Sequence, residues 1–458
     1  MKIKKTLLIL GIIIGLLIII EGYYFIYLRK RPNILLITVD ALRPDHLGCY
    51  GYKRDTSPNI DSIAKDGIIF TQAIAQGAST IPSLPSLMYS RYFKTSEVKP
   101  TINRIKNTKL PILSLQEILR ANGYFTIFAC AHSAIPQIKA VLKGWDKIFE
   151  FDDIKPHAQL VTNKIVRWLK EYGGKLWRKP FFLWIHYMDT HTPYVLPLYY
   201  KAKFCWDELF YPPYPIKILD RPPWLGGIPL AFIEYNITDF RYYIAQYDGA
   251  INFVDDYIGF IMDYLKENNL YNNTLIIISS DHGEAMGEHN FFLVHSLHLY
   301  DEFIRVPLIM KLPKNLKEGK RIQNQVQLID VAPTILHITG INKIDSMQGE
   351  SLLPLILKDE GRKREYAFSN TGTLCCIRTP KYKLIFHKDK NFYELYDLEK
   401  DPGELKNLID TGAYNEELFN IFKQELDIWL NQKSFYSFVE DSSLKELKRE
   451  LKNLGYME

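Results

Sequence analysis

The chain has 458 residues, of which 47% are hydrophobic and 24% are charged. This composition is typical of a globular protein, with a length suited to two or three domains, and it excludes a largely disordered chain. The formal net charge of +5 is small for this length. No basic run has a nucleic-acid-binding pattern, so we expect no nucleic-acid partner.

An apolar N-terminal segment predicts a membrane anchor. Three lysines precede the apolar run 7–20, and the run resumes at residues 23–28. Together the two runs span about 22 residues, roughly 33 Å as a helix, which is enough to cross a bilayer. A cleaved signal peptide is the alternative, but no small-x-small cleavage site follows the apolar core. We therefore expect residues 1–30 to form a single transmembrane helix.

Predicted strands and helices alternate in the next part of the chain. The predicted strands cover residues 33–39, 124–130, 181–186 and 275–279. The predicted helices cover residues 58–66, a segment from Thr80, and residues 113–122, 160–172 and 242–268. This alternation predicts an α/β fold with a doubly wound, mixed but mainly parallel sheet flanked by helices.

Two of the predicted strands end in residues that bind metal ions well. The apolar run 274–279 leads into Asp281 and His282, where Gly283 lets the backbone turn, and another apolar run ends at Asp40. In open α/β sheets, ligands bind beyond the carboxyl ends of the strands. The two ends could therefore meet at one edge and offer oxygen and imidazole ligands to one divalent ion. A solvated polar turn after each strand is the alternative.

A hydroxyl-rich segment between these strands is a candidate for the reacting group. Residues 79–91 contain several serines, Thr80 and two prolines at the start of a predicted helix. A Ser or Thr N-cap of an ordinary helix is the other interpretation, and it is compatible with catalysis.

A long irregular segment is predicted between residues 195 and 236. It is rich in Pro, Tyr and Trp. Such long loops inside a compact domain are usually functional or disordered. We expect a lid or a substrate wall rather than a passive insertion.

The pattern changes from about residue 360. Short strands are predicted at residues 374–378, 381–387 and 391–398. An amphipathic helix follows, whose apolar face contains Ile421, Phe422, Leu426, Trp429 and Leu430. The end of the chain is therefore predicted to be a small α+β unit.

Six segments together resemble the sulfatase family, within the alkaline-phosphatase superfamily. They occur in the family's order, at residues 33–52, 80–91, 181–194, 280–307, 330–334 and 394–408. The resemblance implies a catalytic α/β domain over residues 31–358 and a small C-terminal subdomain of antiparallel sheet and helix over residues 359–458. Combined with the predicted anchor, it implies a cell-membrane protein whose catalytic domain is extracytoplasmic.

The resemblance also implies a metal centre. The ligands that it implies are Asp40, Thr80, Asp281 and His282. This oxygen-rich set with one imidazole suits one Mn²⁺, Mg²⁺ or Ca²⁺ ion, with Zn²⁺ as the alternative. Because metal coordination lowers the pKa of a bound hydroxyl, Thr80 would be the nucleophile.

Several other residues are implied near the substrate. His191 corresponds to a substrate-contacting histidine of the family, and His295 occupies the place of a lysine or histidine near the leaving group, where it could act as a general acid. For His289 and His298 an ordinary hydrogen-bonding role is the stronger interpretation. Supporting roles behind the ligands are open to Asp45 and His186.

The chain departs from the family at two places. Sulfatases carry a Cys or Ser at the position of Thr80, which is oxidised to formylglycine within a C/S-x-P-x-R motif. Here the motif reads Thr-Ile-Pro-Ser-Leu and lacks both the oxidisable residue and the arginine. Ala131 and Ser133 stand where sulfatases have a lysine and a histidine, and His132 is a candidate substitute.

These observations predict a membrane-anchored, metal-dependent hydrolase. Its expected substrates are sulfate or phosphate mono- and diesters, on a lipid, a glycan or a small molecule. Relatives with threonine at the nucleophile position act on phosphoesters, so a phospho-group transferase acting on lipid head groups or cell-surface glycans is the alternative. A catalytically inactive binding module is the third possibility, and the three retained ligands argue against it.

Overall fold

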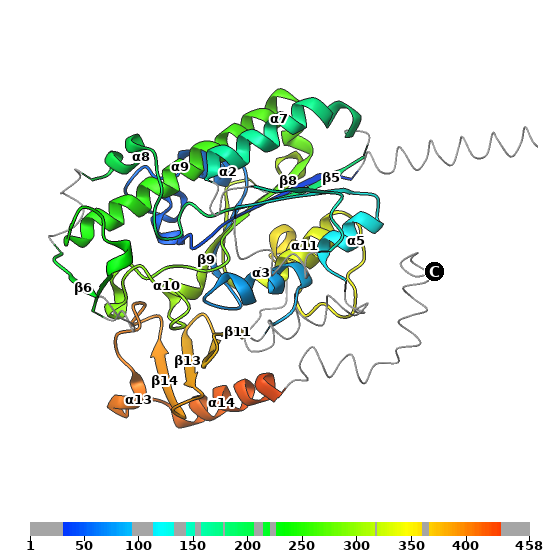
Figure 1. Cartoon of the computed structure of the whole chain (residues 1–458). Helices are drawn as coiled ribbons and strands as arrows, with labels where there is room; N and C mark the ends of the chain where they lie inside the picture. The colour runs from blue at the N-terminus through cyan, green and yellow to red at the C-terminus, as the bar shows by residue number, and fades with distance from the viewer. Residues whose placement is uncertain are drawn as a thin grey trace, which may run out of the picture.

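An eight-stranded sheet forms the centre of the computed structural model (Figure 1). Its strand order is β10-β2-β9-β8-β1-β5-β3-β4, and every pair is parallel except those made by β9, which runs antiparallel to both neighbours. The strands are β1 (Asn33–Val39), β2 (Ile68–Ile74), β3 (Phe125–Cys130), β4 (Lys147–Phe149), β5 (Phe181–Tyr187), β8 (Thr274–Ser279), β9 (Arg305–Lys311) and β10 (Lys320–Gln327). The expectation of a mixed, mostly parallel α/β sheet is confirmed.

The structure describes most of the chain between residues 31 and 431. The described ranges are 31–93, 113–131, 143–151, 157–176, 179–205, 214–219, 226–316, 318–359 and 366–431. The predicted anchor, residues 1–30, lies outside them. In the ranges given, no helix has both the length and the apolar character needed to cross a membrane.

Helices cover both faces of the sheet, as Figure 1 shows. The central strand β1 is buried along its whole length because alternate side chains enter two different cores. Leu35 and Ile37 pack in one core with α7 and α9, whereas Ile34 and Leu36 pack in the other with α3 and α11. The helices on the first face are α2 (Pro58–Lys65), α7 (Ala158–Leu176) and α9 (Phe240–Glu267), and those on the second are α3 (Thr80–Tyr89), α5 (Leu115–Ala121) and α11 (Val331–Ile338).

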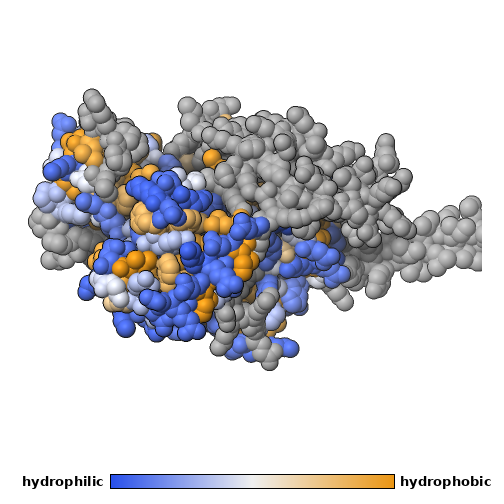
Figure 2. All heavy atoms as spheres, turned by 90° about the horizontal axis from the view of Figure 1, so that it is seen from below, coloured by the Kyte–Doolittle hydropathy of each residue, from blue (hydrophilic) through white to orange (hydrophobic). Residues whose placement is uncertain are grey.

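A smaller antiparallel sheet follows in the C-terminal part. It consists of β11 (Ala367–Asn370), β12 (Leu374–Arg378), β13 (Tyr382–His387) and β14 (Phe392–Asp397), in that order. Helix α14 (Glu416–Asn431) packs on it through Phe422, Leu426 and Trp429. The side of the molecule on which this sheet lies is largely hydrophilic, with scattered apolar groups (Figure 2). The small C-terminal antiparallel sheet is therefore confirmed.

A buried group of charges joins the two sheets. The Lys383 side chain, on β13, is 0% exposed, and its Nζ lies 2.6 Å from Asp301 Oδ1 and 2.8 Å from Glu404 Oε1. Arg378, on β12, makes a second ion pair with Asp301. Asp301 begins the short helix α10 (Asp301–Ile304), just before β9. The C-terminal sheet is thus fastened to the chain that forms the central sheet.

Most of the predicted elements are present, with boundaries shifted by a few residues. Strands β2, β4, β9 and β10 of the central sheet were not predicted, and β9 is the one that makes the sheet mixed. The remaining helices and strands are α8 (Leu198–Lys203), β6 (Lys217–Leu219), β7 (Gly227–Pro229), α12 (Leu353–Lys358) and α13 (Leu408–Thr411). The segment expected to be irregular between residues 195 and 236 contains α8, β6 and β7. Its role as a lid or substrate wall stays a prediction, as does the division into domains.

Candidate active site

The predicted metal ligands come together at the carboxyl edge of the central sheet. Strands β1 and β8 are parallel neighbours with Thr38 opposite Ser279, so the residues that follow each strand emerge side by side. The Ala41 N–H donates to Asp281 Oδ1 at 3.3 Å. The backbone N–H of Asp40 also donates to the Tyr187 carbonyl on β5, at 2.8 Å. Asp40 and Asp281 are both 0% exposed.

His282 turns one ring nitrogen towards both carboxylates. Its Nε2 lies 3.5 Å from Asp40 Oδ1 and 3.6 Å from Asp281 Oδ2. Its Nδ1 lies 2.8 Å from the Gly283 carbonyl oxygen. Because a carbonyl only accepts, Nδ1 carries the proton, and in the neutral ring the Nε2 lone pair faces Asp40 and Asp281.

Gly283 was predicted to allow a turn of the backbone, but the structure shows that it is required by a close approach of two chain segments. A Cβ at this position would lie 2.0 Å from the Glu302 carbonyl oxygen, and the Gly283 N–H donates to the Phe303 carbonyl at 2.8 Å. The chain leaving β8 therefore passes directly against the chain that enters β9. Only glycine allows that close approach.

Thr80 reaches this cluster from the first turn of α3. Its Oγ1 lies 3.2 Å from Asp40 Oδ2 and 3.3 Å from His282 Nε2. Ser79 is the N-cap residue, so Thr80 is not the helix cap. Ser83 donates to the Gly77 carbonyl at 3.0 Å, which engages its hydroxyl in the loop before the helix. Thr80 is the hydroxyl of this segment that contacts the cluster.

His186, for which the sequence suggested a supporting role, lies within the same cluster. It is the penultimate residue of β5, and its Nε2 is 3.5 Å from Asp40 Oδ2. Its other nitrogen, Nδ1, lies 2.8 Å from Thr38 Oγ1, which also accepts a hydrogen bond from Trp184. Asp40, His186 and Asp281 offer ligand atoms that all lie within 4.8 Å of one another.

The other two predicted histidines lie beside His282. The ring centroid of His295 is 4.6 Å from that of His282 and 4.8 Å from that of His191. Nδ1 of His295 is 3.2 Å from Oε1 of Glu284, a buried carboxylate. His191 Nδ1 lies 2.6 Å from the carbonyl oxygen of Thr192. His191 and His295 therefore form an imidazole wall next to Thr80, Asp40 and His282.

The charges of the cluster fit a bound cation. Asp40 Oδ1 and Asp281 Oδ2 are buried and have no hydrogen-bond partner among the residues that the structure describes. Burial raises the pKa of Asp40, but a hydrogen bond with His186 and the charges of His191 and His282 outweigh it, so its pKa lies well below the usual range. Buried carboxylate oxygens without partners are costly unless they coordinate an ion. The donor set fits one divalent metal, as predicted, and does not select its identity.

The remaining candidates lie outside this cluster. Asp45 pairs with Arg43 at 2.6 Å, and Arg43 Nη1 donates to the Glu284 carbonyl at 3.0 Å, so Asp45 acts at most through Arg43. His289 and His298 stack on the two sides of Tyr300. His132 falls outside the described residues.

Two contributors were not predicted. Glu284, the partner of His295, stands three residues after Asp281, so it was visible in the sequence as a further acid in the same turn. Tyr247, on α9, donates to the Ala41 carbonyl at 2.7 Å and accepts from the Arg43 N–H at 2.9 Å. A helical tyrosine in an apolar stripe carries no signal of such a role.

The fold is an α/β sheet with buried Asp and His residues at its carboxyl edge. Similarity to known proteins identifies the family. Residues 32–341 match the sulfatase family, and residues 287–432 match the C-terminal region of N-sulphoglucosamine sulphohydrolase. The first match spans more than half of the chain, so the protein belongs to the sulfatase family. The prediction of a sulfatase-like enzyme acting on ester bonds is confirmed.

Relatives align over most of the chain. A sulfatase of Formosa agariphila is 25% identical, covering 85% of this chain and 85% of its own. The solved structure of a phosphonate monoester hydrolase of Agrobacterium radiobacter has a TM-score of 0.68 at 20% identity, covering 87% of this chain and 96% of its own. A protein solved in complex with its substrate D-glucosamine-2-N,6-O-disulfate also has a TM-score of 0.68 at 20% identity, covering 88% and 99%. These two structures share the fold.

Proposed function

We propose that the protein is a membrane-anchored, metal-dependent hydrolase that cleaves sulfate or phosphate mono- and diesters with Thr80 as its nucleophile. The observation that carries this proposal is the position of Thr80 Oγ1, 3.2 Å from Asp40 Oδ2 and 3.3 Å from His282 Nε2. No other hydroxyl of the segment 79–91 has such contacts among the described residues. The proposed ligands are Asp40, Thr80, Asp281 and His282, joined by His186 at the edge of the cluster.

The residues around Thr80 suit an ester transfer. A divalent ion bound here supplies positive charge that favours the deprotonated hydroxyl. Thr80 Oγ1 forms a bond to the phosphorus or sulfur of the ester while the bond to the leaving oxygen breaks. The hydrogen bond from Thr80 Oγ1 to Asp40 Oδ2, 3.2 Å long, orients the hydroxyl, and its proton passes to solvent. Water then attacks the group held on Thr80, and the free hydroxyl is restored.

The imidazole wall suits the leaving group. His295 is paired with Glu284 at 3.2 Å, so a protonated ring has a buried counter-charge. From there it can donate a proton to the leaving oxygen as a general acid. His191, whose ring lies 4.8 Å from that of His295, is placed to contact the substrate's charged oxygens. Charge neutralisation and positioning are the main requirements of phosphoryl transfer.

The substrate class is narrowed by Thr80 itself. A threonine cannot take the place of the oxidised Cys or Ser of sulfatases, which favours phosphorus esters over sulfate esters. The phosphonate monoester hydrolase with the same fold is compatible with that choice. Sulfated sugars remain the competing substrates, because a relative with the same fold was solved with a glucosamine disulfate. The predicted anchor at residues 1–30 would place the enzyme at the cell membrane, facing lipid or glycan esters.

A phospho-group transferase is the second candidate, and the same threonine favours it. A group held on Thr80 can pass to an alcohol as well as to water. Turnover in the presence of glycerol or a sugar alcohol separates the two activities: a hydrolase releases inorganic phosphate, whereas a transferase releases less phosphate and forms a new ester.

A substrate panel tests the main proposal. The purified protein is assayed with matched nitrophenyl esters of sulfate, phosphate, a phosphodiester and a phosphonate, with Mn²⁺, Mg²⁺, Ca²⁺ and Zn²⁺ in turn. We expect turnover of phosphorus esters above sulfate esters, and loss of turnover after chelation. Turnover of the sulfate alone would contradict the role given to Thr80, and turnover unaffected by chelation would contradict the metal.

A further inference from the structure

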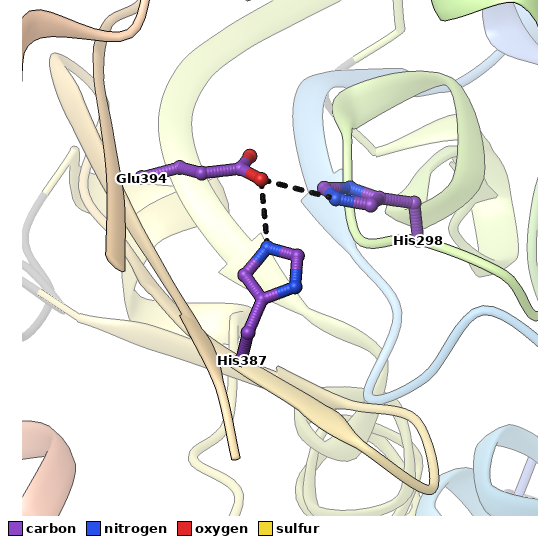
Figure 3. Close-up of side chains that lie close together, drawn as sticks. All are labelled: His298, His387 and Glu394. Carbon is purple, nitrogen blue, oxygen red and sulfur yellow. Dashed lines mark hydrogen bonds and ion pairs between the residues drawn. The ribbon is translucent and has the colours of Figure 1, made fainter. Parts of the chain in front are cut away.

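A second group of metal-binding side chains lies where the C-terminal sheet meets the chain between β8 and β9. His387 and Glu394 belong to the neighbouring strands β13 and β14, and His298 belongs to the β8–β9 connection. All three are buried. Figure 3 shows both imidazoles directed at the same carboxylate oxygen of Glu394. None of the three contributes to the candidate active site.

The carboxylate of Glu394 is oriented by two tyrosines. Its Oε2 accepts hydrogen bonds from Tyr300 at 3.2 Å and from Tyr396 at 2.9 Å. This leaves Oε1 for the histidines, with His387 Nε2 at 2.7 Å and His298 Nε2 at 3.6 Å. The group therefore supplies one fixed anionic oxygen.

His298 is held in place but poorly hydrogen-bonded. Its ring stacks on Tyr300 at a centroid distance of 3.7 Å, and its Nδ1 is buried without a hydrogen-bond partner in the described part of the chain. At 3.6 Å its Nε2 is beyond normal hydrogen-bond distance from Glu394 Oε1.

We propose that His298, His387 and Glu394 form a second metal site, which binds Zn²⁺ and fastens the β8–β9 connection to the C-terminal sheet. Two imidazoles and a carboxylate are a zinc donor set that leaves a fourth position for water. Ligand atoms on a tetrahedral zinc ion lie roughly 3.3 Å apart. The spacing of His298 and Glu394 is already close to this value, and the shorter contact of His387 opens by about half an ångström. Binding the ion requires His387 Nε2, which donates to Glu394 Oε1 at 2.7 Å without the ion, to lose its proton, and the remaining ring proton is then on Nδ1.

The proposed zinc site would affect the candidate active site through the chain segment that it holds in place. His298 lies three residues after His295, whose ring is 4.6 Å from that of His282. A zinc ion on His298 would restrict that short stretch from the C-terminal side. The proposal stands on these three side chains and does not depend on the reaction proposed for Thr80.

Metal stoichiometry tests the proposal. The purified full-length protein in detergent is stripped with a chelator and titrated with Zn²⁺, and retained zinc is measured after gel filtration. In an Asp281→Asn background, which weakens the active-site cluster, we expect one equivalent to remain. His387→Gln and Glu394→Gln in that background should each lose it. His337→Gln, which removes an exposed histidine that belongs to neither cluster, should retain it.

Absorption spectroscopy and melting temperature test the same proposal in case the ligand variants fold poorly. Co²⁺ added to the Asp281→Asn protein should give the visible absorption of a tetrahedral site with imidazole ligands, and one equivalent of Zn²⁺ should abolish it. Zinc should also raise the melting temperature of the Asp281→Asn protein but not that of the double variant with His387→Gln. Equal zinc retention with and without His387, or the lack of a Co²⁺ spectrum, would overturn the proposal.

Discussion

Thr80 Oγ1 and Asp40 Oδ2 lie 3.2 Å apart, although one residue begins a helix and the other follows the central strand of the sheet. The contact is made possible by the topology. Strand β1 lies in the middle of the sheet, and α3 packs on one of its faces with its first turn at the carboxyl edge. A hydroxyl and a carboxylate from distant segments thereby share one buried position.

Replacing Thr80 tests its role most directly. Thr80→Ala should abolish turnover, because loss of a nucleophile typically costs several orders of magnitude in rate. Folding should survive, since Ser79 is the N-cap and the loss of a buried hydroxyl's hydrogen bonds costs roughly 1 kcal/mol. Thr80→Ser should keep partial activity, because the oxygen remains while the methyl that restricts its rotamer is lost. Near-normal turnover by Thr80→Ala, or a covalent adduct found on Ser79 or Ser83 by mass spectrometry, would place the nucleophile elsewhere.

Replacing His295 tests the proposed general acid. His295→Gln should lower kcat by roughly 10²–10⁴ for alkyl esters, whose leaving oxygen needs a proton. The loss should be much smaller for nitrophenyl esters, whose leaving group departs without one. The exposed His337→Gln is the control and should leave both rates unchanged. An equal loss for both classes of ester would mean that His295 only positions the substrate.

The buried charges at the junction predict a large stability effect. Lys383→Met leaves Asp301 and Glu404 buried without their common cation, and breaking a buried pair in this way typically costs about 3–5 kcal/mol. Denaturant unfolding measures the change. The neighbouring Lys381 makes an exposed pair with Glu399, so Lys381→Met should change stability by less than about 1 kcal/mol. Similar effects of the two variants would show that the buried network is not a stabilising joint.

Lys311, on β9, predicts a pH dependence of stability. It is fully buried and donates to the carbonyls of Tyr271 and Thr274, and burial lowers the pKa of Lys311 to about 8 from 10.5. Between these two values the unfolded chain binds a proton that the folded protein has lost, so stability rises with pH across this window. Below pH about 8 both states are charged and the effect is constant.

The measurement compares the wild type with Lys311→Met by denaturant unfolding from pH 7 to 10. The free energy of unfolding of the wild type should gain on that of the variant as the pH rises, by at most about 3 kcal/mol. Parallel pH profiles for the two proteins would show that Lys311 stays charged when buried.

We expect the predicted anchor to be separable from the described fold. Deleting residues 1–30 should release a soluble, folded and active enzyme, because β1 begins at Asn33. Detergent-free gel filtration and the ester assay check this. An inactive or aggregated fragment, alongside active full-length protein in detergent, would make the N-terminal segment part of the functional structure.

The strands that lead into Asp40 and Asp281 could be predicted from the sequence, whereas β2, β9 and β10 on one side of them could not. Asp40 and Asp281 were placed correctly at strand ends because their strands are continuous apolar runs, which mark central parallel strands. The partly exposed β10 lacks such a run, and the direction of β9 leaves no trace in residue types. His295 was placed near the site by family resemblance. The contacts of His298 with the C-terminal sheet depend on segments that are distant in sequence, and no local pattern reports them.

The antiparallel direction of β9 determines where the sequence of this enzyme can change without disturbing the central sheet. Because β9 runs back from the edge at which β8 ends, the whole connection from residue 280 to residue 304 begins and finishes beside the reaction centre. A crossover to a parallel strand would instead carry the chain to the opposite edge. Residues can therefore be inserted or exchanged between the fixed positions of this connection, such as Gly283 and Asp301, while every strand keeps its register. New ester preferences can arise there without rebuilding the scaffold.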